Sequence, residues 1–139
     1  MKQLRSLKNP YVKSLVLLKE KVKARQKTGT FLIEGKKEIS LAFKGGYEIQ
    51  TVLFYSDICS ENEIRKWLKD VQLIQINKKI FEKLAYRKKS DGVIGVAKSK
   101  TLSLSNLKLT ERPLILVAET PEKPGNIGTL LRTADAANV

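Results

Sequence analysis

The segment TFLIEGKKEISLAFKGGYEIQTVLFY, residues 30–55, predicts a strand, a helix and a second strand in succession. TFLIEG is a short apolar run closed by Gly35, and YEIQTVLFY is rich in β-branched and aromatic residues. Between them, KKEISLAFKGG has a helical pattern that ends at Gly45 and Gly46. Such a unit is the building block of α/β sheets, so residues 30–55 predict an α/β fold class.

The same alternation extends to both sides of this segment. SENEIRKWLKD begins with Ser60 and has Glu63 three residues later, a capping-box pattern that predicts a helix start. VQLIQI and GVIGVAK predict strands, and NKKIFEKLAYR predicts a short helix between them. We therefore expect a βαβ sheet with helices on its faces. Upstream we expect one amphipathic, cationic helix, whose apolar stripe is Leu4, Leu7, Tyr11, Leu15, Leu18 and Val22.

A change of composition divides the chain. Residues 99–112, SKTLSLSNLKLTER, are small and polar without a clear period, which predicts an exposed linker between a first domain over residues 1–98 and the start of a second over 113–139. In the second, PLILVAE predicts a strand buried on both faces. NIGTLLRTADAAN predicts the following helix, with Asn126 as its N-cap.

Basic residues exceed acidic ones and are unevenly distributed. The net charge is +13, and the first 30 residues hold nine basic side chains against the single acid Glu20. Two separate basic clusters favour a polyanionic partner, because neutralised phosphates release counterions. Solvated helix faces are the alternative, and a membrane surface is disfavoured since neither cluster is backed by an aromatic and leucine face. The candidate RNA ligands are Arg5, Lys8, Lys13, Lys23, Arg25, Lys27, Lys78, Lys79, Arg87, Lys88 and Lys89.

Residue types that are scarce exclude several kinds of chemistry. The chain has no histidine and one cysteine, Cys59, so we expect no metal site of the usual zinc type and no Ser-His or Cys-His nucleophile. Cys59 is expected to be a small buried apolar group. No apolar run reaches the roughly 18–20 residues of a membrane span, and no signal peptide is recognisable, so we expect a soluble, cytoplasmic protein.

The loop and helix PEKPGNIGTLLRTADAANV, residues 121–139, hold the candidate catalytic groups. The loop follows the predicted strand, where α/β sheets place ligand sites. Gly125 and Gly128 are three apart, which excludes the dinucleotide fingerprint, and a phosphate-binding P-loop ending is absent. Arg132 leans toward the start of the helix past Gly128, where it can hold a phosphate or a developing oxyanion. An ion pair of Arg132 with Asp135 is the alternative.

The segment PGNIGTLLRTADA resembles the first of the three motifs of the SpoU (TrmH) family of RNA ribose 2′-O-methyltransferases, in which Asn-x-Gly and Arg-Thr-Ala open a knotted α/β domain. LILVAE is similar to the family's first strand. Residues 29–55 and SDGVIGVAK resemble the N-terminal substrate-binding domain of many of these enzymes. The resemblance implies a three-layer α/β/α RNA-binding domain, like that of ribosomal proteins that bind RNA turns, and then the first strand and helix of a SPOUT-type domain.

The resemblance also implies an activity, the transfer of a methyl group from S-adenosylmethionine to a ribose 2′-hydroxyl of structured rRNA or tRNA by a homodimer. Arg132 matches the family's catalytic arginine and Asn126 its motif-one asparagine, while Gly125 and Gly128 let a backbone approach closely. The family's cofactor-binding motifs follow the first one and do not occur in these 139 residues. We therefore expect the N-terminal part of an enzyme that binds RNA but does not by itself bind S-adenosylmethionine.

Two other functions remain open at this point. A stand-alone RNA-binding module of the ribosomal-protein type would use residues 1–98 alone. A structural or assembly protein that binds a partner through the basic helix accounts less well for the Asn-x-Gly and Arg-Thr loop. Tyr86, within the second basic cluster, is either a stacking group for a base or a residue packed at the edge of the core.

Overall fold

A five-stranded sheet forms the centre of the first unit of the structure, in the order β1-β4-β3-β5-β2. The computed structural model describes residues 2–87, 90–121 and 123–138, and the chain divides into the units Met1–Thr101 and Leu102–Val139. The strands are β1 (Lys2–Leu4), β2 (Thr30–Glu34), β3 (Ile49–Tyr55), β4 (Gln72–Ile76) and β5 (Val93–Lys98).

Four of the five strands end at the same edge of the sheet. β1 and β3 both pair parallel with β4, whereas β5 lies antiparallel between β3 and β2. The last residues of β1, β2, β3 and β4 are Leu4, Glu34, Tyr55 and Ile76, and we call the edge that they define the carboxyl edge. The loop that precedes β5 also lies there, because β5 runs in the opposite direction.

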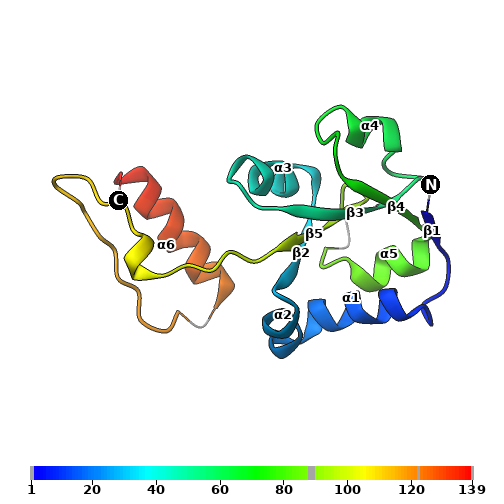
Figure 1. Cartoon of the computed structure of the whole chain (residues 1–139), viewed down its shortest axis with the longest axis horizontal. Coiled ribbons are helices and arrows are strands. Elements are labelled where there is room, and N and C mark those ends of the chain that lie inside the picture. The colour runs from blue at the N-terminus through cyan, green and yellow to red at the C-terminus, as the bar shows by residue number, and fades with distance from the viewer. Residues whose placement is uncertain (1, 88–89, 122, 139) are drawn as a thin grey trace. The chain divides into compact units, whose positions relative to one another are not determined.

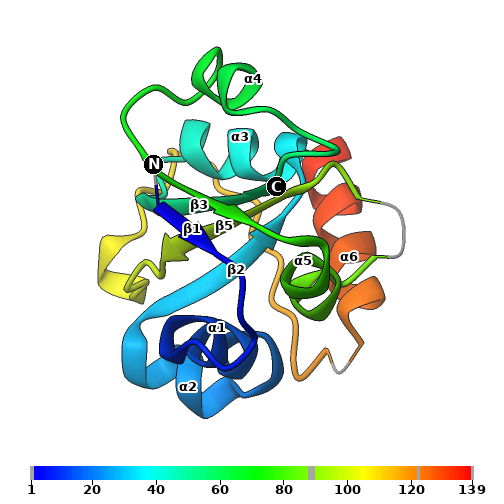
Figure 2. The ribbon, with the colours of Figure 1, turned by 90° about the vertical axis from the view of Figure 1, so that its right-hand side faces the viewer.

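Helices cover both faces of the sheet, as Figures 1 and 2 show. The helices α1 (Pro10–Glu20), α2 (Val22–Thr28) and α5 (Lys78–Leu84) lie on one face, and α3 (Lys36–Lys44) and α4 (Glu61–Arg65) on the other. Two buried clusters match these layers: Leu15, Leu53 and Ile80 belong to the first, and Ile39 and Val52 to the second. The predicted three-layer α/β/α fold is confirmed.

The antiparallel strand β5 departs from the βαβ pattern predicted from the alternation of elements. Helix length does not account for this difference, since α4, with five residues, joins the parallel strands β3 and β4, whereas α5, with seven, precedes the antiparallel β5. The loop between α5 and β5 returns the chain to the carboxyl edge, where it enters β5 and runs back between β3 and β2.

The single N-terminal helix predicted from the apolar stripe is wrong in its bounds. Leu4 is the last residue of β1, the outermost strand of the sheet, which pairs with β4. The helix α1 begins only at Pro10, with Asn9 as its N-cap. Proline suits the first helical position and disfavours helical backbone in the residue before it. The helix ends again at Lys21, which is extended (φ −120°, ψ 119°), so Val22 belongs to α2.

The second unit contains a 3₁₀ turn at Leu104–Asn106 and the helix α6 (Pro124–Ala136). The strand predicted over residues 113–119 is not formed, and its apolar residues 114–117 are exposed. A strand needs a neighbour to pair with, and the described residues of this unit contain none. Asn126 is not the N-cap as predicted, because α6 starts at Pro124 with Lys123 in the cap position.

No helix in the described part of the chain combines the length and the apolar character needed to cross a bilayer.

Candidate nucleic-acid interface

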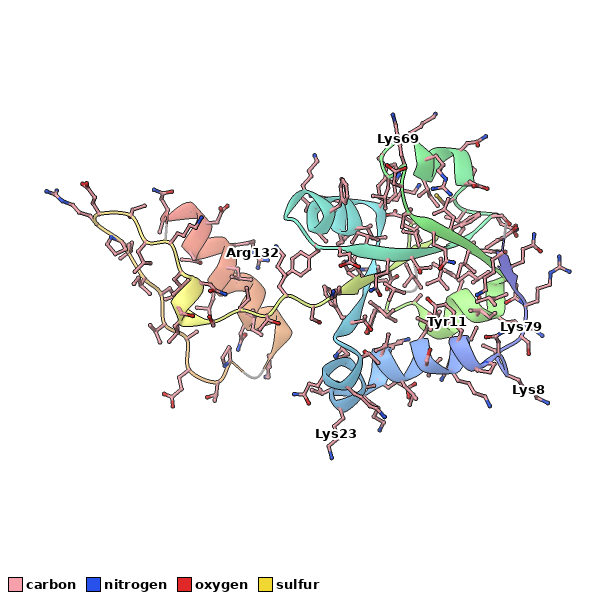
Figure 3. The ribbon with its side chains drawn as sticks, viewed as in Figure 1. Lys8, Tyr11, Lys23, Lys69, Lys79 and Arg132 are labelled. Carbon is pink, nitrogen blue, oxygen red and sulfur yellow. The ribbon has the colours of Figure 1, made fainter. Side chains whose placement is uncertain are left out.

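Basic side chains from separate loops meet at the carboxyl edge. Arg5 follows β1 directly, and Lys78 and Lys79 open α5 immediately after β4. Lys8 lies in the connection between β1 and α1, and Figure 3 draws Lys8 and Lys79 at the same end of the domain. The topology thus places four of the predicted RNA ligands at one edge, although two sequence segments supply them.

Arg87 reaches this edge through the loop between α5 and β5. The carboxylate of Glu34, which is only 8% exposed, accepts the backbone N–H groups of Tyr86 at 2.5 Å and Arg87 at 3.4 Å. The guanidinium of Arg87 pairs with Glu38 on α3 at 2.9 Å, and this hydrogen bond raises the pKa of Arg87. Lys88 and Lys89, also predicted as RNA ligands, lie outside the described residues.

Lys36 is a further cation at the carboxyl edge that the sequence did not single out. Its Nζ lies 2.5 Å from a carboxylate oxygen of Glu63, and its backbone N–H donates to Asp91 at 3.2 Å. The hydrogen bond between the side chains raises the pKa of Lys36 and lowers that of Glu63. These contacts join α3, α4 and the loop before β5, so Lys36 fixes the loops of the edge.

The buried carboxylate of Glu34 was also missed, although its signal is present in the sequence. It is the one charged residue in TFLIE, the otherwise uncharged strand β2. A carboxylate is rarely buried unless it is hydrogen-bonded, so a charge at the end of such a strand indicates a partner. The partners here are the backbone amides that hold the basic loop in place.

The basic residues of α2 lie away from the carboxyl edge. The helix α2 ends at Thr28, just before β2 begins, so Lys23 and Lys27 are near the opposite edge of the sheet. Figure 3 draws Lys23 far from Lys8 and Lys79. Arg25 donates from its guanidinium to the carbonyl oxygen of Leu18 at 2.8 Å, and it thereby caps the end of α1. The structure therefore separates the N-terminal basic cluster into two groups.

Two other predicted residues, Lys13 and Tyr86, lie on the face of the sheet that α1, α2 and α5 cover. Lys13 lines an apolar cavity of about 410 Å³ beside Leu17. Tyr86 is 59% exposed, and the Nζ of Lys19 lies 5.2 Å from the centroid of its ring. Tyr86 is therefore not part of the core, and a role in base stacking stays a prediction.

In the second unit, the guanidinium of Arg132 folds back along α6 toward its first turn. It donates to the hydroxyl of Thr129 at 3.2 Å, and a Cβ atom added at Gly128 would lie 3.5 Å from Nη1 of Arg132. The arginine side chain thus passes close to Gly128, at an ordinary contact distance that a small side chain at this position would also allow. The alternative ion pair between Arg132 and Asp135 is not found among the described residues.

The second unit by itself does not fit S-adenosylmethionine. Asn126 and Arg132 lie on one helix, both are exposed, and Gly125 has nothing within 4 Å of the position of a Cβ atom. The cavities described here are lined by residues of the first unit. No group of three acidic or cysteine side chains in the described part of the chain lies close enough together to hold a metal ion.

The fold and the site together define a class: a three-layer α/β/α domain with a basic carboxyl edge, followed by a helix with the Asn-x-Gly and Arg-Thr-Ala pattern. The family model described as the MRM3-like substrate-binding domain matches residues 9–95. This chain belongs to that family. The resemblance to SpoU-type enzymes is confirmed by the proteins to which the chain is similar.

Three of these proteins show how far the similarity in sequence and structure extends. The 23S rRNA (guanosine(2553)-2′-O)-methyltransferase RlmP of Bacillus subtilis (strain 168) is 29% identical over 139 residues, which are 100% of this chain and 52% of that protein. A crystal structure of an RNA 2′-O ribose methyltransferase is 34% identical, with a TM-score of 0.78 over 97% of this chain and 52% of the other. The AdoMet-bound rRNA methyltransferase from Sinorhizobium meliloti is 26% identical, with a TM-score of 0.73 over 98% and 51%. The chain spans about half the length of the curated relatives it matches.

Proposed function

We propose that this chain is the RNA-binding domain and first catalytic motif of an S-adenosylmethionine-dependent RNA ribose 2′-O-methyltransferase. The observation that carries the proposal is the convergence of Arg5, Lys8, Lys78, Lys79 and Arg87 on the carboxyl edge of a domain of the substrate-binding family. Ribosomal RNA is the proposed substrate, because the similar proteins are named as rRNA methyltransferases. A tRNA substrate is the alternative within the same chemistry.

The carboxyl edge binds structured RNA through its phosphates in this proposal. Lysine and arginine side chains that neutralise phosphates release condensed counterions, which supplies most of the sequence-independent affinity. Lys78 and Lys79 extend from one helix, and Arg5 and Lys8 from the chain beside it. Four cations along one edge follow a phosphate backbone better than a cluster on one helix face would.

Arg132 serves catalysis in the complete enzyme. A ribose hydroxyl is a poor nucleophile, so the site must stabilise the negative charge that develops on its oxygen. A guanidinium stays protonated at any physiological pH and is therefore a donor to the oxyanion or to the adjacent phosphate, rather than a base. Asn126 supports the loop and the substrate ribose.

We also propose that the complete enzyme works as a homodimer in the cytoplasm. The exposed apolar residues 114–117 of the second unit need a covering surface in the complete enzyme, because an exposed apolar patch is unfavourable in water. The remaining strands of a SPOUT-type sheet supply that surface within one chain, so the homodimer rests on the family resemblance alone.

Methyl transfer by a full-length protein that contains this chain tests the proposal. With unmodified rRNA transcripts and labelled S-adenosylmethionine, we expect label on one ribose. Arg132→Ala should lower the single-turnover rate by about 100-fold or more, the effect of removing one transition-state donor, with RNA affinity within about twofold of the unmodified protein. Arg132→Lys keeps the positive charge but removes the planar guanidinium with its paired N–H donors, so the rate of this variant shows which of the two the reaction needs.

The matched control is Arg112→Ala, which removes an exposed arginine of the same unit and should leave the rate unchanged. Absence of transfer to any rRNA or tRNA transcript would refute the proposed activity. A near-normal rate of the Arg132→Ala enzyme would instead remove Arg132 from the catalytic groups.

A further inference from the structure

A cavity of about 300 Å³ opens at the carboxyl edge, where the three adjacent strands β1, β4 and β3 end. It lies at the carboxyl ends of parallel strands, the place where α/β sheets bind ligands. Its volume is at the lower end of the range of small-molecule pockets, which suits a single ring system better than an extended ligand. Polar and charged side chains make up most of its lining.

A row of side-chain hydrogen bonds crosses the three strands at this cavity. Arg5 donates to the amide oxygen of Gln3 at 2.9 Å, and Gln3 donates to the amide oxygen of Gln75 at 2.8 Å. Gln75 in turn donates to the hydroxyl of Ser56 at 2.9 Å. Gln3 and Gln75 are partners in the register of β1 and β4, so the sheet itself aligns their amides. Each amide NH₂ group keeps a second hydrogen for a further acceptor.

An acidic group completes the lining. Asp57 follows β3 and accepts a hydrogen bond from the hydroxyl of Tyr55, which raises the pKa of Tyr55. A carboxylate inside the cavity disfavours a phosphate there, whereas carboxylate, amide and hydroxyl groups together match the mixed donors and acceptors of a base edge. The cations Arg5 and Lys78 stand in the same lining. Lys78 also lies 3.9 Å from a carboxylate oxygen of Glu82, an exposed and therefore weak pair that a phosphate of the same strand can replace.

We propose that this cavity holds one unpaired nucleobase of the RNA, with Arg5 and Lys78 on the flanking phosphates. The inference rests on the proposed function, since it assigns a particular subsite to the RNA-binding edge. The base must be unpaired, because in an A-form duplex the Watson–Crick edges are engaged in pairing and a stacked base cannot enter a cavity. The cavity therefore selects loops, bulges or ends rather than duplex RNA.

The test compares two RNA probes of equal phosphate number on the whole 139-residue chain. One is a hairpin with a randomised loop of about eight nucleotides, and the other is a fully paired duplex. We expect the chain to bind the hairpin at least about tenfold more tightly, the scale of one bound base. Gln75→Leu should reduce this ratio to within about twofold of unity while the affinity for the duplex stays unchanged. Asp57→Ala should reduce the ratio to the same extent, although the loss of a carboxylate beside Arg5 and Lys78 raises both affinities.

Gln50→Ala is the matched control, because Gln50 is an exposed glutamine at the other end of β3. It should leave both affinities as they are. If both cavity variants bind the duplex and still prefer the hairpin as strongly as the unmodified chain does, the inference is wrong and the proposed function stands. Absence of binding to either probe would overturn the proposed function itself. Displacement of the hairpin by micromolar mononucleotides would identify a small-molecule site and also overturn the inference.

Discussion

Arg5 and Arg25 belong to the same basic segment of the sequence and have different roles in the structure. Arg25 donates to backbone carbonyl groups at the end of α1, whereas Arg5 contacts Gln3 at the edge of the sheet. Both arginines carry the same charge, and the difference depends on where α1 ends, which the sequence pattern misplaced. Individual contacts of this kind could not be predicted, because they depend on the bounds of neighbouring elements.

Cys59 was predicted to be a buried apolar group, and the structure confirms it, with an exposed fraction of 1%. Burial raises the pKa of its thiol from 9.0 to about 11. Between pH 9 and about 11, the thiol keeps its proton in the native state and loses it in the unfolded state. The free energy of unfolding should therefore fall as the pH rises through this range.

The thiol of Cys59 should consequently react slowly in the folded protein. At pH 8 we expect the reaction with a disulfide reagent to be at least about 100-fold slower than in the urea-unfolded chain, because the thiolate fraction and the access of the reagent both decrease. The absorbance of the released chromophore measures the rate. The variant Ser103→Cys supplies an exposed thiol as an internal control. If the native protein without the Ser103→Cys substitution shows one rapidly reacting thiol per chain, Cys59 is not buried as the structure describes.

At the scale of elements, the capping box at Ser60 predicted a helix start correctly, whereas the cap predicted at Asn126 and the apolar stripe of the first helix did not. Ser60 accepts the backbone N–H of Glu63 at 3.2 Å, as the capping-box pattern indicated. The stripe from Leu4 to Val22 instead spans a strand and two helices, because Pro10 and the extended Lys21 interrupt it. Side chains that contact one core recur at similar spacing in different elements, so the period alone did not fix the boundaries.

The turn that enters β5 depends on Gly92. Its φ of +76° is unfavourable for other residues, and an added Cβ atom would lie 2.7 Å from the Cβ atom of Ile58. Gly29 has a similar φ of +61°, with nothing within 4 Å of that position. We expect Gly92→Ala to lower the free energy of unfolding by about 3 kcal/mol, and Gly29→Ala by about 1 kcal/mol.

Urea unfolding followed by the fluorescence of Trp67, the single tryptophan, measures both glycine variants. Because the backbone strain is similar at the two positions, the difference between them reports the contact with Ile58. Equal losses of stability would show that this contact does not constrain the turn.

For the whole molecule, the sequence predicted the layers and the two basic clusters, but not that residues of both clusters meet at the carboxyl edge. That meeting depends on β1, the short strand of Lys2–Leu4, whose pairing with β4 places Arg5 beside Lys78. Three residues are too few for a periodic signal of their own, so the apolar stripe predicts a helix there. Residues 114–117 show the opposite case, since their apolar pattern predicts a strand but the described residues offer no neighbouring strand.

The central claim, that RNA binds along the carboxyl edge, is tested most directly by the salt dependence of RNA affinity in two charge-matched variants. One replaces Lys8, Lys78 and Lys79 with alanine, and the other replaces Lys21, Lys23 and Lys27. Each phosphate contact contributes about 0.7–0.9 to the slope of log affinity against log salt. We expect the first variant to lose about two units of slope and the second less than about half a unit. Equal losses, or a larger loss in the second variant, would contradict the account.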